Sequence, residues 1–385
     1  MLYEMSEVLL DLKSFLHDKN EPVLITDVLK WGLLNWSLED WKNVLEEEEL
    51  EFRLGVFEAT EKPQWERTCK LVRNNFDYLL NHVNNNTNEW LYFDYKHLNS
   101  WFKNIEQVRQ SINWSTIGFP DVKPEDCTIW IGTKGAHTPC HLDCYGFNLV
   151  YQIYGKKLWV LFPPEENLLP SRIPYEESSI YSKLNFFSPN LNDFKGISKC
   201  RKIELNPGDI LFVPHKWWHY VENLTTSISV NVWLPLVEDH EERFKESVVQ
   251  FFAKQITDLS SNDVNRIILN PNMDDVILES SESLMDILNK CKRICKENLS
   301  SKRVLGSKER GETQKIVTDI NDFVSTIPVM SKEDFTLFLN KQIDRFNGSK
   351  LKEHPVYKKD DNVELFEAIT DPRVIELITN ILLKK

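Results

Sequence analysis

The chain has 385 residues, of which 41% are hydrophobic and 27% charged, a balance typical of a soluble globular protein rather than a disordered one. Its formal net charge is −13, from 46 basic and 59 acidic residues. This acidic balance argues against a general affinity for a phosphate backbone, so nucleic acid is a disfavoured partner.

The length predicts two domains, or one large domain with an extension. The first residues, M-L-Y-E-M-S-E-V-L-L-D-L-K, carry acids where a signal peptide carries bases, and no apolar run is long enough to span a bilayer. Seven cysteines, an odd number at scattered spacings, do not predict a disulfide framework. We therefore expect a cytoplasmic protein with reduced thiols and no membrane partner, with the nucleus as the other compartment to consider.

Between about residues 20 and 240 the chain contains short runs rich in Trp, Phe, Val and Ile, which favour strands. The predicted strands lie at residues 21–28, 51–57, 127–132, 147–154, 157–164, 209–214 and 227–234. A helix is predicted after Ser37, which is placed to cap it with Asp40 at the third helical position. Many short strands indicate a mainly β core, a barrel or double sheet, rather than a doubly wound α/β fold.

Beyond residue 240 apolar residues recur at helical spacing. Three sets of positions show it: 244, 248, 251, 252, 256 and 259; 316, 320, 323 and 327; and 374, 377, 378 and 381. A polar stretch at 300–315 predicts a mobile linker. The expected organisation is a β-rich domain over 1–243, with its motifs at 120–240, followed by a helical region over 244–385.

The stretch G-A-H-T-P-C-H-L-D-C, residues 135–144, concentrates residues that can bind a metal. If the following run is a strand, the H-L-D triplet before it is extended too, and alternate side chains of a strand share a face. His141 and Asp143 are therefore expected to point the same way, whereas His137 lies across Pro139. A second stretch, N-P-G-D-I-L-F-V-P-H-K-W-W-H-Y at 206–220, carries His219.

Two imidazoles and one carboxylate match the facial triad that holds Fe(II) by three positions and leaves the others open. The alternatives are a packed histidine at His215 or His219, and zinc at Cys140 and Cys144. C-x₃-C without a second Cys/His pair is a poor zinc pattern, and buried cysteines usually act as small hydrophobes. Trp217, Trp218 and Trp233 are expected in the core, where any of them can pack against the triad.

Four motifs occur in order: T-P-C-H-L-D at 138–143, N-L-V-Y-Q-I-Y-G-K-K-L-W-V-L-F-P-P at 148–164, P-G-D-I-L-F-V-P-H-K-W-W-H-Y-V-E-N-L at 207–224, and S-V-N-V-W at 229–233. Over roughly residues 20–240 the chain closely resembles the JmjC oxygenases, in the branch that includes the asparaginyl hydroxylase of hypoxia-inducible factor. The resemblance implies a double-stranded β-helix (cupin, jelly-roll) fold that uses Fe(II), 2-oxoglutarate and O₂. It also implies that His141, Asp143 and His219 bind the iron, and that His137, Cys140 and Cys144 do not.

The same resemblance assigns residues to the co-substrate. Lys157 corresponds to the lysine that binds the distal carboxylate of 2-oxoglutarate, although a lysine in Y-G-K-K also fits a solvated turn. Thr138 supplies a hydroxyl at that carboxylate, and Tyr92 is a weaker correspondence to a tyrosine that reaches it. Asn148 and Asn231 correspond to amides near the iron and the near end of the co-substrate.

R-I-P-Y-E-E-S-S-I-Y-S-K at 172–183 resembles the JmjC proteins associated with a small heat-shock protein, which implies such a partner and a link to stress response. One difference from the asparaginyl hydroxylases is an additional residue between Asp143 and Asn148, on the substrate side. Hydroxylation of a protein side chain is the preferred activity. The alternatives are a catalytically silent scaffold for the heat-shock protein, an N-demethylase and a tRNA-base hydroxylase. The C-terminal helices either form a homodimer, dock a partner or pack on the barrel.

Overall fold

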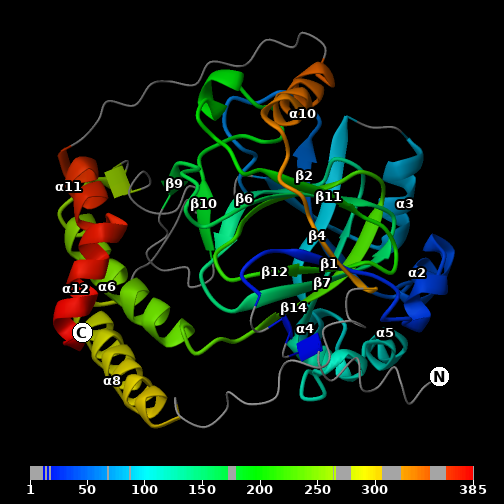
Figure 1. The fold of residues 1–385 in the computed structure, drawn as a ribbon. Coiled ribbons are helices and arrows are strands. Elements are labelled where there is room, and N and C mark those ends of the chain that lie inside the picture. The colour runs from blue at the N-terminus through cyan, green and yellow to red at the C-terminus, as the bar shows by residue number, and fades with distance from the viewer. Residues whose placement is uncertain are drawn as a thin grey trace.

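The computed structural model describes residues 12–384 except for positions 14, 17–18, 67–68, 86–87, 172–178, 263, 266–278, 306–321 and 347–360. Its strands form two antiparallel sheets (Figure 1). In spatial order, the large sheet contains β15 (Val324–Thr326), β1 (Val23–Ile25), β12 (Ile210–Val213), β7 (Phe147–Tyr154), β14 (Ser227–Leu234), β5 (Cys127–Gly132), β4 (Glu89–His97), β2 (Leu50–Val56) and β3 (Lys70–Asn74). The small sheet contains β11 (Arg201–Leu205), β8 (Lys157–Phe162), β13 (Trp218–Asn223), β6 (His137–Asp143), β10 (Ser179–Ser182) and β9 (Pro170–Ser171).

Consecutive strands alternate between the two sheets from β5 to β8, and again from β11 to β14. This alternation is the topology of a jelly roll, so the predicted double-stranded β-helix is confirmed. Strands β5, β7 and β14 begin and end close to where their apolar runs predicted. Almost every residue in them is buried, because both faces of the sheet are covered.

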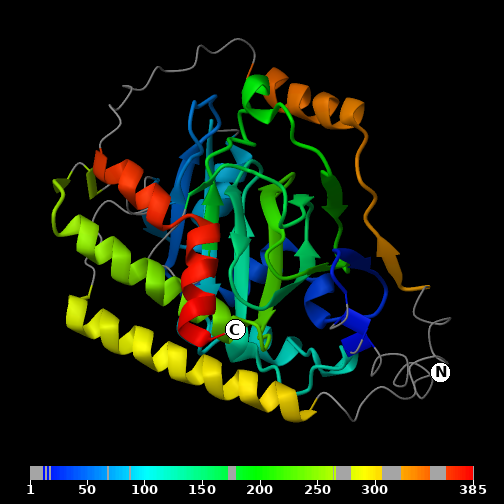
Figure 2. The ribbon, with the colours of Figure 1, turned by 60° about the vertical axis from the view of Figure 1, so that its left-hand side comes forward.

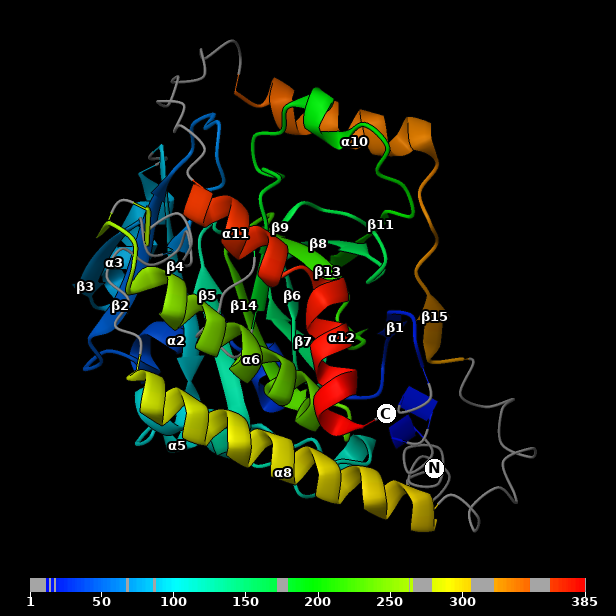
Figure 3. The same cartoon turned by 90° about the vertical axis from the view of Figure 1, so that its left-hand side faces the viewer.

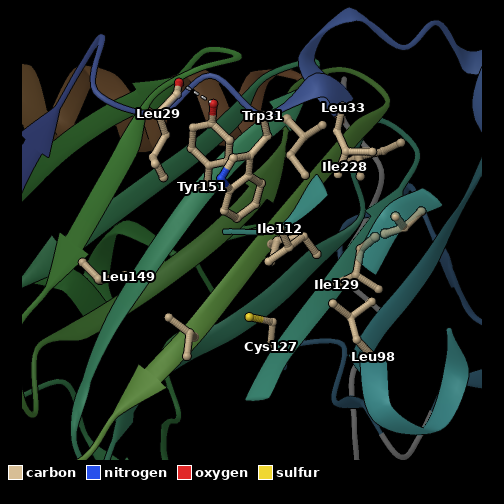
Figure 4. Close-up of a cluster of buried hydrophobic side chains, with 14 of the residues drawn as sticks. Leu29, Trp31, Leu33, Leu98, Ile112, Cys127, Ile129, Leu149, Tyr151 and Ile228 are labelled. Carbon is tan, nitrogen blue, oxygen red and sulfur yellow. Dashed lines mark hydrogen bonds between the residues drawn. The ribbon is translucent and has the colours of Figure 1, made fainter. Parts of the chain in front are cut away.

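The outer face of the large sheet packs against the N-terminal half of the chain. Figure 4 shows this cluster, in which side chains from β5, β7 and β14 meet Leu98 and Ile112. Trp31 packs edge-on against Tyr151, with 4.6 Å between ring centroids, and the Tyr151 hydroxyl donates to the Leu29 carbonyl at 2.8 Å. Side chains alternate between the two faces of a strand, so the residues between these apolar ones face the small sheet.

Short helices connect the N-terminal strands. They are α2 (Leu38–Val44), α3 (Phe76–Asn84), α4 (Leu98–Trp101) and α5 (Glu106–Ser111). The predicted cap of α2 is present: Ser37 Oγ accepts from the Asp40 N–H at 3.2 Å, and Asp40 accepts from the Ser37 N–H at 2.7 Å.

The later helices are α6 (Asp239–Thr257), α8 (Ser281–Leu305), α10 (Lys332–Asp344), α11 (Asp361–Ile369) and α12 (Pro372–Leu383). Helices α6, α8, α11 and α12 lie together on one side of the barrel (Figures 2 and 3). Helix α10 lies apart from them and packs on the small sheet, where its apolar residues join a cluster that includes Phe162 and Phe186. No helix among the described residues is both long and apolar enough to cross a membrane.

Two expectations for the C-terminal region are wrong where the structure describes it. The helical spacing at 316–327 predicted a helix, but Val324–Thr326 forms β15 and pairs with β1 at the sheet edge. Residues 316–321 lie outside the described part. The predicted linker at 300–315 is helical up to Leu305, since α8 continues that far. A few apolar residues at helical spacing cannot exclude a strand when a sheet edge lies open nearby.

Candidate metal centre

Two neighbouring strands of the small sheet carry the predicted metal ligands. His141 and Asp143 lie on β6, and His219 lies on β13 directly opposite His141. Asp143 carboxylate oxygens lie 3.8 Å from His141 Nε2 and 3.9 Å from His219 Nε2. One ligand atom from each of the three residues lies within 4.8 Å of the other two. Among the described residues this is the cluster with metal-binding spacing, and His137, Cys140 and Cys144 are not part of it.

A bulge in β6 decides which side chains reach the site. The register runs from His219 opposite His141 to Val221 opposite Thr138, so β6 has one residue more than β13 over this interval. Thr138 and His141, three residues apart, therefore both line the cavity between the sheets. His137 is turned to the opposite face, where its ring stacks on Phe187 with 4.0 Å between centroids.

Hydrogen bonds orient both imidazoles for metal binding. His141 Nδ1 lies 2.9 Å from the Pro139 carbonyl, and His219 Nδ1 lies 2.9 Å from the Trp217 carbonyl. A carbonyl oxygen only accepts, so each Nδ1 carries the proton and each Nε2 keeps its lone pair for a metal. Burial, reinforced by the neighbouring His219, lowers the pKa of His141 to about 4, so this ligand is neutral at pH 7.

The carboxylate ligand is also held. Trp233 Nε1 donates to Asp143 Oδ2 at 2.8 Å. Of the three tryptophans expected near the triad, Trp233 reaches it through its side chain and Trp217 through its backbone carbonyl. Trp218 lies instead in the apolar cluster on the other face of the small sheet.

A cavity lies between the two sheets, and His141 and His219 are among the residues that line it. It brings together seven of the eight residues predicted for the site: Tyr92, Thr138, His141, Asn148, Lys157, His219 and Asn231. The eighth, Asp143, is not among the lining residues but belongs to the cluster of metal-binding atoms with His141 and His219. The other lining residues are Trp130, Val150, Trp159, Val221, Ser229 and Trp233.

Lys157 is a buried cation inside this cavity, not a solvated turn residue. It is only 2% exposed, and its Nζ donates to Ser229 Oγ at 2.8 Å and to Tyr92 Oη at 3.3 Å. None of the described residues forms an ion pair with it. Burial lowers its pKa to about 7, and Asp94 opposes this shift. The ammonium also lies 5.4 Å from the centroid of the Tyr92 ring and 5.7 Å from that of Trp130. A buried ammonium held by hydroxyl groups and aromatic faces is suited to bind an anion.

The register also sets the distance between the two ends of the cavity. Lys157 lies four residues along β8 from Leu161, the residue paired with His219. Four residues of a strand span roughly 13 Å, of which the lysine side chain covers part. His219 and Lys157 are therefore separated along the sheet by more than a lysine side chain spans.

The two asparagines are fixed by a short chain of hydrogen bonds. Asn231 Nδ2 donates to Asn148 Oδ1 at 2.8 Å, and Trp130 Nε1 donates to Asn231 Oδ1 at 2.7 Å. Both amides are buried, and both line the cavity. They are therefore placed to donate to an oxygen-rich ligand beside the metal.

Besides two valines, Val150 and Val221, sequence reasoning missed three residues of the cavity: Trp130, Trp159 and Ser229. Ser229 lies two residues before Asn231 on β14, and Trp159 lies two residues after Lys157 on β8. Alternation along a strand is the signal that would have found both. No comparable signal identifies Trp130, since β5 is apolar on both faces.

Comparison with known proteins adds a family to this geometry. The family model described as "Cupin-like domain" matches residues 11–239. HSPB1-associated protein 1 of Homo sapiens is 36% identical over 277 residues, which cover 67% of this chain and 57% of that protein. The Rattus norvegicus protein of the same name is 39% identical over 261 residues, covering 63% and 54%. "Lysine-specific demethylase JMJ31" of Arabidopsis thaliana is 29% identical over 161 residues, covering 40% and 28%. The chain thus spans little more than half the length of the HSPB1-associated proteins it matches.

Proposed function

Since the chain belongs to the family of cupin-like, JmjC-type domains, we propose that it is an Fe(II)- and 2-oxoglutarate-dependent oxygenase. One observation carries the proposal: His141 and His219 of the two-histidine, one-carboxylate cluster line the same cavity as Lys157, a buried lysine for which the described residues provide no ion-pair partner. A binding scaffold has no physical need for either, because burying an uncompensated cation costs stability.

The residues present fit both the metal and the co-substrate. His141, Asp143 and His219 would hold Fe(II) by one face, with Nε2 atoms and a carboxylate oxygen as ligands. Lys157 would bind the distal carboxylate of 2-oxoglutarate, assisted by the Ser229 hydroxyl. When bound, Fe(II), 2-oxoglutarate and O₂ together supply an oxidant for a C–H bond, with release of succinate and CO₂.

The surrounding residues position the ligands and exclude water. Asn148 and Asn231 would direct amide groups at the near end of the co-substrate, because their mutual hydrogen bond fixes their orientation. Trp159 stacks on His219 with 5.5 Å between ring centroids, and Tyr181 stacks on His141 at 5.6 Å. These aromatic rings restrict the imidazoles to the orientation that a metal needs.

For the reaction and partner, we propose hydroxylation of a protein side chain. The relatives named HSPB1-associated protein favour a small heat-shock protein as substrate or partner, linked to stress response in the cytoplasm, with the nucleus as the other compartment. The similarity to a relative named lysine-specific demethylase keeps N-demethylation as the second activity, since the same chemistry applies to a carbon on nitrogen. A tRNA base is a less suitable substrate for a chain of net charge −13.

A homodimer through the C-terminal helices has one supporting observation. Helix α12 has an exposed apolar stripe, with Leu377 60% and Ile381 66% exposed, besides the apolar face that packs on α6. Exposed apolar side chains aligned along one helix are common at interfaces.

The proposal is tested by anaerobic titration of the metal-free protein with Fe(II) and then 2-oxoglutarate. We expect the visible charge-transfer band of a chelated co-substrate in the wild type. His141→Ala should abolish the band, and Lys157→Ala should require much more 2-oxoglutarate to produce it. Well-folded wild-type protein without a band would contradict the proposal and favour a catalytically silent scaffold that binds a small heat-shock protein.

A further inference from the structure

The first turn of α6 contacts both segments of chain that carry the metal ligands. One segment is the loop 144–146, which follows Asp143. The other is the turn 214–217, which precedes His219. We infer that this turn of α6 positions the metal ligands, so that the C-terminal helical region is part of the metal centre. The inference rests on the proposed function, which supplies the metal.

Asp239 holds the loop that follows Asp143. Its Oδ1 accepts from the Gly146 N–H at 2.8 Å, and its Oδ2 accepts from the Leu236 N–H at 2.9 Å. The residue is only 7% exposed, so both bonds form away from water, where losing an acceptor is costly. Its negative charge at the start of α6 is also favoured by the helix dipole.

Gly146 permits this close approach. Its φ is +63°, and a Cβ there would lie 2.4 Å from the Leu234 carbonyl oxygen. The loop is therefore packed directly against the segment that leads from β14 into α6. Next to it, the Arg243 guanidinium lies 4.4 Å from the centroid of the Tyr145 ring, which adds a second contact between α6 and this loop.

Glu242 holds the turn that precedes His219. Its Oε2 lies 2.7 Å from Lys216 Nζ, and Lys216 has a left-handed backbone with φ +60°. Lys216 is followed by Trp217, whose carbonyl accepts from His219 Nδ1 at 2.9 Å. A shift of this turn would therefore move the acceptor that orients the His219 ring.

The two segments are also joined to each other. His215 Nδ1 lies 3.1 Å from the Gly146 carbonyl oxygen. Asp239, Glu242 and His215 thus connect the loop 144–146, the turn 214–217 and the start of α6 to one another. Loops without such contacts are the most mobile parts of a fold, and a metal site needs ligands held to fractions of an ångström.

The same turn also connects to the last helix. Lys245 Nζ lies 2.7 Å from Glu376 Oε2 on α12 and 3.3 Å from Glu242 Oε1. Because Lys245 contacts both carboxylates, the position of Glu242 depends on the packing of α12 against α6. This gives the helical region a role that packing on the barrel alone would not require.

The test uses Co(II), because its visible spectrum reports coordination geometry and its affinity is measured without turnover. In the 385-residue chain we expect Asp239→Ala and Glu242→Gln to weaken Co(II) binding by roughly 10-fold or more, the range found when groups that orient metal ligands are removed. At saturating Co(II) their spectra should differ from that of the wild type. Lys216→Arg keeps a cation to pair with Glu242, so this variant should have the Co(II) affinity and spectrum of the wild type.

Lys254→Gln is the matched control, since Lys254 lies on the same helix and pairs with Asp258 at 2.7 Å, away from the site. It should leave the affinity and the spectrum unchanged. The inference is overturned if Asp239→Ala and Glu242→Gln lower the unfolding temperature but leave the Co(II) affinity and spectrum as in the wild type. Glu242→Gln keeps the inference testable if Asp239→Ala does not fold. A different result would contradict the proposed function and not the role of α6: the wild type would bind Co(II) but give no charge-transfer band with Fe(II) and 2-oxoglutarate.

Discussion

Lys157 is the residue whose protonation controls co-substrate affinity. Burial lowers its pKa to about 7 from an ordinary 10.5, so in the free protein it loses its charge as the pH rises above 7. A dicarboxylate needs the charged form. We therefore predict that 2-oxoglutarate affinity is constant below about pH 7 and falls by up to about tenfold per pH unit above it. Titrations from pH 6.5 to 9 with proton uptake by calorimetry would measure this, and a flat profile would contradict it.

The lowered pKa of Lys157 makes the stability of the fold rise with pH, whereas it makes the co-substrate affinity fall. Between about pH 7 and 10.5 the unfolded chain binds the Lys157 proton and the folded chain does not. The contribution of this group to stability therefore rises with pH across that window. His141, with a pKa of about 4, does not titrate there, so it does not obscure the co-substrate profile.

Trp233 gives a second prediction, for the carboxylate ligand. Trp233→Phe keeps an aromatic ring but removes the 2.8 Å donor to Asp143 Oδ2. We expect Fe(II) affinity to fall by about 10-fold or more, as is typical when a ligand loses its orienting hydrogen bond. Trp218→Phe is the matched control, because the Trp218 Nε1 has no hydrogen-bond partner among the residues that the structure describes. Equal affinities in the two variants would show that the bond does not orient Asp143.

Alternation along β6 predicted that His141 and Asp143 point the same way, whereas the residues assigned to the co-substrate came from the resemblance to the JmjC oxygenases. The bulge in β6 could not be predicted, since one additional residue reverses the alternation between Thr138 and His141. Contacts between segments that are far apart in the sequence could not be predicted either. Tyr181 stacks on His141 and donates to Glu66, which is 115 residues away in the sequence.

Among the elements, α10 is held on the barrel by a buried ion pair. Glu222 on β13 is 3% exposed and accepts from Arg345, just after α10, and from Tyr220 Oη at 2.7 Å. Arg345→Met would leave the Glu222 carboxylate without its cation. We predict a loss of about 3–5 kcal/mol in the free energy of unfolding, the cost of breaking a buried pair. Chemical denaturation would measure it.

Two further variants define the cause. Arg373→Met removes a pair with Asp371 on the surface, where Arg373 is 89% exposed, and should leave the stability close to that of the wild type. Combining Arg345→Met with Glu222→Met should recover part of the loss, because no buried charge is then left alone. A double variant as unstable as Arg345→Met alone would show that the packing of α10, not the charge, is responsible.

Elements with strong local signals could be predicted, and those defined by their neighbours could not. Strands β7 and β14 are rich in β-branched and aromatic residues and are buried on both faces, and Ser37 with Asp40 marks the start of α2. Strand β3 is largely exposed and polar, so nothing in its composition separates it from a loop. Strand β15 exists because β1 offers an unpaired edge, which is a property of the fold.

For the whole molecule, the region after residue 243 completes the barrel as well as adding helices. Strand β15 pairs with β1, some 300 residues earlier, and Ile327 lies in an apolar cluster with Trp159 and Val221. Helix α10 buries Phe335 in the cluster on the small sheet. A division into a β domain and a helical region, although reasonable from composition, therefore separates segments that share one core.

This arrangement predicts different outcomes for two truncations. A chain ending at residue 243 loses β15 and α10, which exposes the β1 edge and the apolar surface under Phe335 and Ile327. Its five residues of α6 are also too few to form a stable helix. We expect it to aggregate, because open sheet edges and apolar patches promote association.

A chain ending at residue 346 keeps β15, α10 and Arg345, and loses only α11 and α12. We expect its barrel to fold and to retain metal binding, with weaker affinity if the link from Glu376 to Lys245 supports the first turn of α6. Size-exclusion chromatography and Co(II) titration of both truncated chains against the 385-residue chain would check this. If α12 forms the proposed dimer, the 346-residue chain is a monomer and the 385-residue chain is not. A soluble 243-residue chain with wild-type Co(II) affinity would show that the C-terminal segments are dispensable for the barrel, against the shared core described here.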